Sequence, residues 1–180
     1  VIYLDVEDIS SELVGLQEKN EEIESYLVNG GEFSTTSNSS TVKLRHGDLL
    51  VFESGNGIVV PYTFQPLPTR TTYIDVGDVS YDSSFQESLA EAQVAPEKSS
   101  YEPSGEGFAL DIDEPDDWGY ASGKSGGLAI ALQVAATDDS VKLKDGVAAT
   151  GRVNTEGRVL SVNGVREKSL AAKRAGYDTV

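Results

Sequence analysis

Hydrophobic and polar residues follow regular patterns along most of this 180-residue chain. The longest nearly apolar run, 128–136, has the length of a buried helix and is too short to span a membrane. Apolar residues at helical spacing predict helices over 10–28 and 165–175, and alternation predicts a strand over 107–112. A mixture of helices, strands and hairpins favours an α+β fold with a mixed sheet over a doubly wound parallel sheet.

Turn residues divide the chain and mark its hairpins. The polar stretch at 30–41 is the best boundary, so we expect a small N-terminal segment over 1–41, made of a short strand, a helix and a linker, before a domain over 42–180. Within that domain, His46 to Asp48 reads as a turn between strands at 42–45 and 49–53. The SFQE sequence at 84–87 reads as a capping box.

Further strands are predicted for 58–64 and 71–76, with prolines interrupting the chain after the first of them. Another is predicted for 146–153, followed by a turn at 154–157 and a hairpin partner at 158–162.

The net charge of −16 is unevenly distributed. Residues 1–120 hold 5 basic and 24 acidic groups, whereas 121–180 hold 9 basic and 6 acidic groups. Nucleic acid is a poor partner for such an acidic chain. One His and no Cys argue against a structural zinc site, and we expect no metal and no cofactor. The sequence contains no signal peptide and no membrane-spanning run, so we expect a soluble protein of undetermined location.

A glycine-flanked serine, in GKSGG at 123–127, directly precedes the apolar run. Ser125 is expected at the positive end of that helix, where unpaired backbone N–H groups stabilise an oxyanion, so it is a candidate nucleophile. An ordinary serine N-cap explains the same pattern, and the motif alone favours the cap.

Two other classes that use such a serine are excluded. A phosphate-binding Walker A loop needs a glycine at position 118, which is Trp118. The nucleophile elbow of α/β-hydrolases needs a His after the serine, whereas the single His, His46, lies far upstream. A nucleophilic serine without a His needs another base, and lysine is the remaining common choice.

Lys168 is the candidate base. Ala171, Ala172 and Ala175 follow it at three, four and seven positions, so it emerges from a small apolar stripe that normally packs inward. Burial lowers the pKa of a lysine and makes its neutral form available as a base. A lysine that extends along the edge of a packed face to water explains the helix equally well, and the helix alone favours that interpretation.

Two motifs together resemble Lon-type proteases. The first runs over 148–176 as AATGRVNTEGRVLSVNGVREKSLAAKRAG, and the second is GKSGGL at 123–128, similar to the nucleophile motif of that family. The order of the two motifs is similar to that in the family, and so is the separation of 43 residues between Ser125 and Lys168. The resemblance is best over 107–180, weaker over 71–106, and absent over 1–60.

The resemblance implies a Ser–Lys dyad that hydrolyses peptide bonds through an acyl-enzyme, with protein or peptide substrates and a possible homo-oligomer. Ser125 is then the nucleophile and Lys168 the general base. Thr150 aligns with a threonine whose hydroxyl helps to hold the lysine, and backbone N–H groups near Ser125 form the oxyanion hole.

The chain departs from the family pattern beside the nucleophile. Lys124 replaces a proline and Gly126 replaces an alanine. We expect Lys124 to place a second cation beside the nucleophile, and the loop to be less rigid than in the family. Ser122 replaces an acidic residue, and Asn163 replaces the first glycine of a turn. The family usually continues beyond position 180, which suggests a truncated C-terminus.

Three contexts fit the resemblance: a protease domain of an ATP-driven Lon, an ATP-independent Lon-like enzyme such as the PDZ-bearing membrane-anchored group, or a viral polyprotein protease of the birnavirus type. The unmatched first part favours the ATP-independent enzyme. The alternative from another class is a Lon-fold module without turnover, serving assembly or substrate holding. A phosphate-binding loop at 123–125 is a third and weaker alternative.

Overall fold

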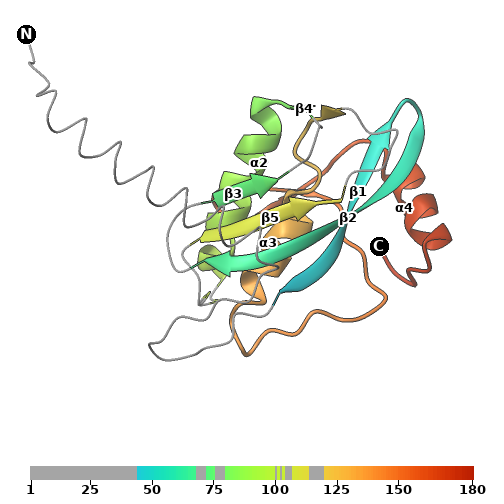
Figure 1. Ribbon diagram of the computed structural model, residues 1–180. Helices are drawn as coiled ribbons and strands as arrows, with labels where there is room; N and C mark the ends of the chain where they lie inside the picture. Colours follow the sequence, from blue (N-terminus) through green and yellow to red (C-terminus); the bar gives the residue numbers. More distant parts are fainter. Residues whose placement is uncertain are drawn as a thin grey trace, which may run out of the picture. The chain divides into compact units, whose positions relative to one another are not determined.

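The computed structural model describes residues 44–67, 72–75, 80–99, 101, 103, 107–113 and 120–180 (Figure 1). The helix predicted for 10–28 and the polar linker at 30–41 lie outside the described residues. The division near residue 41 therefore stays a prediction.

A four-stranded mixed sheet forms the centre of the described region. Its order is β1 (Arg45–Glu53), β2 (Asn56–Leu67), β5 (Gly107–Ile112) and β3 (Thr72–Asp75). β2 is antiparallel to both β1 and β5, whereas β3 runs parallel to β5. The predicted α+β fold with a mixed sheet is confirmed for this region, and β5 has the predicted bounds.

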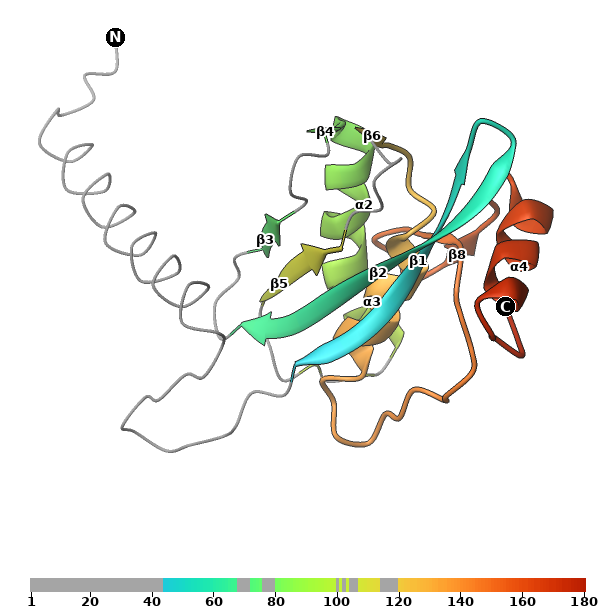
Figure 2. The same ribbon diagram turned by 45° about the vertical axis from the view of Figure 1, so that its right-hand side comes forward.

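Helices α2 (Ser83–Val94) and α3 (Gly127–Ala135) pack against each other on one face of the sheet (Figures 1 and 2). Between the sheet and these helices lies a core of buried apolar side chains, with Phe64 and Phe108 stacked at 5.1 Å between ring centroids. Burying a side chain of this size contributes about 1.5–3 kcal/mol. This core fixes α3, whose N-terminus carries Ser125.

Helix α4 (Val165–Arg174) lies apart from the other two and packs against the β1–β2 hairpin (Figure 2). A second, smaller core beneath it contains Leu50, Ala148 and Ala172. The helix ends in a Schellman motif, in which Gly176, at φ +96°, donates to Lys173 and Tyr177 donates to Ala172. The helix predicted for 165–175 is thus confirmed to within one residue.

Two short strand pairs connect these elements. β4 (Ser80–Tyr81) pairs in parallel with β6 (Tyr120–Ala121), and β7 (Arg152–Val153) pairs antiparallel with β8 (Val159–Leu160). The strand predicted for 146–153 is reduced to β7, because the preceding residues bond to other parts of the chain rather than to a continuous neighbouring strand.

The predicted turn at His46 to Asp48 is wrong. β1 continues through these residues, and Gly47 pairs with Tyr62 on β2. A Cβ at Gly47 would lie 2.5 Å from the Tyr62 ring, so this glycine permits close approach within a strand rather than a turn. The reversal occurs instead at Ser54 and Gly55, both with positive φ.

The capping box predicted at Ser84 and Glu87 is also corrected. Helix α2 is capped by Asp82, whose carboxylate accepts from the Phe85 N–H at 2.9 Å. Ser84 donates its hydroxyl to the same carboxylate at 2.6 Å. None of the helices in the described residues is long and apolar enough to cross a membrane.

Candidate active site

Ser125 lies in the turn immediately before α3. The N-cap of that helix is Gly126, and no side chain caps it. The interpretation of Ser125 as an N-cap is therefore wrong, and its hydroxyl is not used to begin the helix. The side chain is half-buried, at the end of the helix where the dipole is positive.

Gly151 fixes the backbone of this turn from the side. Its N–H donates to the Ser125 carbonyl at 2.9 Å, and its carbonyl accepts from the Leu128 N–H at 2.9 Å. The Thr150 hydroxyl donates to the same Ser125 carbonyl at 3.4 Å. The carbonyl of Ser125 thus points toward 150–151, and the same segment bonds to the first turn of α3.

The start of α3 leaves backbone donors unused. The N–H of Gly127 donates to the Lys124 carbonyl and that of Leu128 to Gly151. Among the described residues, the N–H groups of Ser125 and Gly126 have no hydrogen-bond partner. Two unpaired N–H groups beside a serine hydroxyl can donate hydrogen bonds to a developing oxyanion and stabilise it.

Lys168 is buried in the first turns of α4, with 2% of its surface exposed. Burial lowers the pKa of its amine to about 8. At that pKa a substantial fraction is neutral in mildly alkaline solution, which a general base requires. The predicted inward stripe is confirmed for Lys168, Ala171 and Ala172, whereas Ala175 is exposed because it lies past the end of the packed helix.

Two glycines allow α4 to approach the β1–β2 hairpin closely enough to bury Lys168. A Cβ on Gly57 would lie 2.1 Å from the backbone carbonyl oxygen of Glu167. A Cβ on Gly164 would lie 2.4 Å from the Phe52 ring, and Gly164 also has a positive φ of +68°. The hairpin therefore sets the position of the helix that carries the lysine.

Ser125 and Lys168 line one cavity of about 390 Å³. β1 contributes its apolar wall, from Leu49 to Phe52, and Arg152 and Asn163 also line the cavity. No hydrogen bond joins the Ser125 and Lys168 side chains in the part of the chain that the structure describes. Catalytic hydrogen bonds are often long in the absence of substrate and tighten when it binds.

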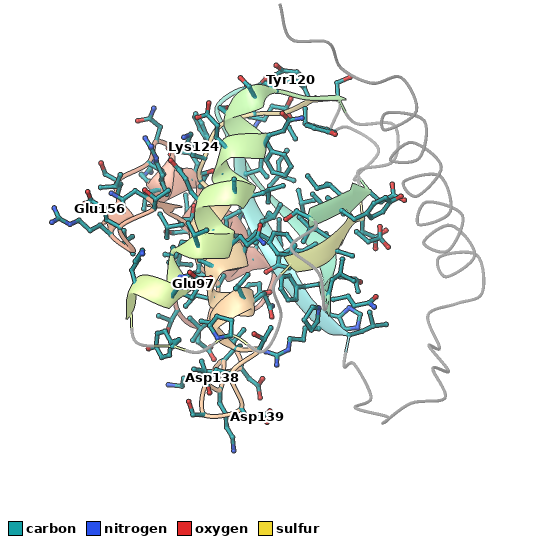
Figure 3. The ribbon with its side chains drawn as sticks, turned by 90° about the vertical axis from the view of Figure 1, so that its left-hand side faces the viewer. Glu97, Tyr120, Lys124, Asp138, Asp139 and Glu156 are labelled. Carbon is teal, nitrogen blue, oxygen red and sulfur yellow. The ribbon has the colours of Figure 1, made fainter. Side chains whose placement is uncertain are left out.

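Lys124 also lines the Ser–Lys cavity, and its amine reaches α2 (Figure 3). Its amine forms ion pairs with Glu87 at 2.7 Å and with Glu91 at 3.0 Å. The hydrogen bond to Glu87 raises the pKa of Lys124. Lys124 is therefore held protonated and cannot replace Lys168 as a base.

Thr150 contacts the serine side of the site rather than the lysine side. Its hydroxyl bonds to the Ser125 carbonyl, and no hydrogen bond with Lys168 forms among the described residues. The role of Thr150 in holding the lysine stays a prediction.

Several residues near the site were not predicted from the sequence. Ser84, Ser88 and Glu91 on α2, together with Arg152 on β7, contact the loop that carries Ser125 or the segment that supports it. The spacing of polar residues along α2 is the sequence feature that indicates these contacts. Positions 84, 87, 88 and 91 share one face of a helix.

Comparison with known proteins agrees with this arrangement. Residues 75–180 match the Lon protease (S16) C-terminal proteolytic domain. The chain is 41% identical over 73 residues to Lon protease of Cytophaga hutchinsonii, which covers 41% of this chain and 9% of that protein. It is 41% identical over 58 residues to Lon protease of Clostridium acetobutylicum and 45% identical over 58 residues to that of Amoebophilus asiaticus. These two matches cover 32% of this chain and 8% and 7% of the relatives.

Fold and comparison together define a serine peptidase domain of family S16. The chain belongs to the Lon protease C-terminal proteolytic domain family. It matches less than a tenth of the length of these three relatives. The resemblance found in the sequence motifs is thus confirmed at the level of the family.

Proposed function

We propose that this chain is an endopeptidase in which Ser125 is the nucleophile and Lys168 the general base, acting without ATP hydrolysis within the chain. The proposal rests on one observation: Ser125 and Lys168 line the same cavity. The serine is half-buried, and the lysine is buried with a pKa of about 8. Membership of the S16 family supports protein or peptide substrates.

In the first step, the neutral Lys168 amine takes the proton of the Ser125 hydroxyl as the serine oxygen attacks the peptide carbonyl carbon. The carbonyl oxygen becomes an oxyanion, and the free N–H groups of Ser125 and Gly126 stabilise it. The ammonium of Lys168 then protonates the leaving amine, which departs and leaves a serine ester.

In the second step, water hydrolyses the ester. Lys168, neutral again, takes a proton from the attacking water, and the ammonium returns that proton to the serine oxygen. The carboxylic acid product leaves and the two side chains regain their starting states. The peptide and one water molecule are consumed, and the products are an amine and a carboxylic acid.

The proposal is tested by peptide cleavage and by covalent labelling with a fluorophosphonate, with the labelled residue identified by mass spectrometry. We expect labelling at Ser125, and loss of both cleavage and labelling in Ser125→Ala and Lys168→Met. Matched controls are Ser83→Ala and Lys173→Met, which alter exposed residues outside the cavity and retain activity. Cleavage that persists in Ser125→Ala contradicts the proposal, and folded wild-type protein that neither cleaves nor labels favours the module without turnover.

A further inference from the structure

Side chains on one face of α2 form hydrogen bonds with the loop that carries Ser125. Ser84 accepts a hydrogen bond from the Gly123 N–H at 2.7 Å, and Ser88 donates to the Lys124 carbonyl at 3.3 Å. One helical turn further on, Glu91 accepts from the Lys124 amine at 3.0 Å. The loop is therefore fastened through its backbone and through a side chain directly next to the serine.

Glu91 also holds the segment on the other side of the nucleophile. Arg152 donates to its carboxylate from Nη2 at 3.0 Å and from Nε at 3.4 Å. Arg152 follows Gly151, whose N–H bonds to the Ser125 carbonyl. A single carboxylate thus joins the residue before Ser125 to Arg152, the residue that follows the segment bonded to the Ser125 backbone.

The ion pairs of Glu91 are partly shielded from water. The exposed fraction of the side chain is 15% for Glu91, 16% for Lys124 and 38% for Arg152. Burial alone would raise the pKa of the Glu91 carboxyl, but hydrogen bonds from Arg152 and Lys124 outweigh it, and the pKa is lowered. Salt screens partly buried pairs of this kind less than exposed pairs.

We propose that Glu91 is a positioning residue for the nucleophile, acting by clamping Lys124 and Arg152 so that the loop holds Ser125 in a fixed geometry. The inference rests on the proposed function, because it concerns the rate of attack by Ser125. A misplacement of a reacting group by about 1 Å can lower the rate about 100-fold. Loss of the clamp therefore lowers kcat and leaves KM nearly unchanged.

The test compares Glu91→Gln with Glu156→Gln, the matched control. Glu156 pairs with Arg158 at 3.4 Å, both side chains are exposed, and Glu156 lies away from α2 (Figure 3). We expect kcat to fall about 10- to 100-fold in Glu91→Gln, with KM changed less than about threefold, and no change in Glu156→Gln. Lys124→Met lowers kcat in the same way, and Lys124→Arg, which keeps the charge, restores most of it.

A second measurement tests, without relying on turnover, whether Glu91 restrains the loop that carries Ser125. Amide hydrogen exchange, followed by mass spectrometry, increases in peptides covering 122–128 in Glu91→Gln and in Lys124→Met, but not in Glu156→Gln. If Glu91→Gln fails to fold, Lys124→Met is compared with Glu87→Gln. The first variant removes the Lys124 pairs with both Glu87 and Glu91, and the second removes only the pair with Glu87.

The outcomes separate the clamp from the proposed function. Active wild-type protein with unchanged kcat and unchanged exchange in Glu91→Gln overturns the clamp and leaves the proposed function intact. Increased exchange in Glu91→Gln together with an inactive wild-type protein shows that Glu91 fastens the loop, but it overturns the proposed function and with it the role of Glu91 in catalysis. A rise in KM at constant kcat shows a substrate-binding role for Glu91 and also overturns the clamp.

Discussion

The carbonyl of Ser125 accepts the N–H of Gly151 at 2.9 Å, and this bond links the candidate nucleophile to the segment that leads to the candidate base. Gly151 is buried, and a Cβ there would lie 3.1 Å from Leu128 on α3. The chain then continues through the β7–β8 hairpin to α4, which carries Lys168. The two halves of the proposed dyad are thus joined by a short path that begins in a well-packed contact with α3.

The pH dependence of cleavage follows from the Lys168 pKa of about 8. Only the neutral amine accepts the serine proton, so kcat/KM rises about tenfold per pH unit below pH 8 and levels off above it. The rate is measured with a fluorogenic peptide between pH 6 and about 9.5, where kcat/KM reports the free enzyme. Lys173→Met, altered at an exposed lysine of the same helix, keeps the profile. A flat profile across this range contradicts the assignment of Lys168 as the base.

Burial of Lys168 destabilises the folded protein, so replacing this lysine with an apolar residue is expected to raise the free energy of unfolding. Its pKa falls from an ordinary 10.5 to about 8 on folding, so the unfolded chain binds more protons between these values. The free energy of unfolding therefore rises with pH across this window, and the full penalty is present below pH 8. At about 1.4 kcal/mol per pKa unit, Lys168→Met stabilises the protein by up to about 3 kcal/mol at pH 7.

Urea unfolding at pH 7 and at pH 10 tests this prediction. The gain in Lys168→Met shrinks at the higher pH, because the wild-type amine is then neutral in the folded state. Lys173→Met shows no comparable gain at either pH. A variant that is less stable than wild type at pH 7 shows that Lys168 makes a favourable contact larger than the cost of its burial.

Sequence-based prediction succeeds here where hydrophobic periodicity is strong. The apolar run of 128–136 corresponds to α3, and alternation over 107–112 corresponds to β5. Motif spacing pairs Ser125 with Lys168, 43 residues further on, and the structure places both at one cavity. Hydrophobic periodicity depends only on residues close together in the sequence, and the motifs depend on resemblance to a family. Both can be recognised from a single sequence.

Long-range contacts are the main source of error. The local pattern makes Gly47 a turn residue, but this glycine permits the approach of Tyr62 from another strand. The same kind of pattern makes Ser84 a cap, but Asp82 takes that role. The pairing of Glu91 with Arg152 depends on how α2 packs against α3 and β7, and no local pattern encodes that distance.

The close contact between Gly57 and α4 gives the last prediction. A Cβ at Gly57 would lie 2.1 Å from the carbonyl oxygen of Glu167, the residue before Lys168. Because that atom belongs to the helix backbone, α4 must move in Gly57→Ala. We expect a loss of about 3 kcal/mol in the free energy of unfolding, at the upper end of typical overpacking effects.

Gly55→Ala, on the same hairpin, is the matched control. Gly55 has a φ of +85°, and a Cβ added there would have no atom within 4 Å, so alanine introduces backbone strain without touching α4. That strain lowers stability by about 1–2 kcal/mol. Both variants are measured by urea unfolding and by kcat at a temperature where each is folded. Gly57→Ala lowers kcat because Lys168 is displaced, whereas Gly55→Ala does not. Equal kcat values in the two folded variants contradict the view that the hairpin sets the position of the lysine.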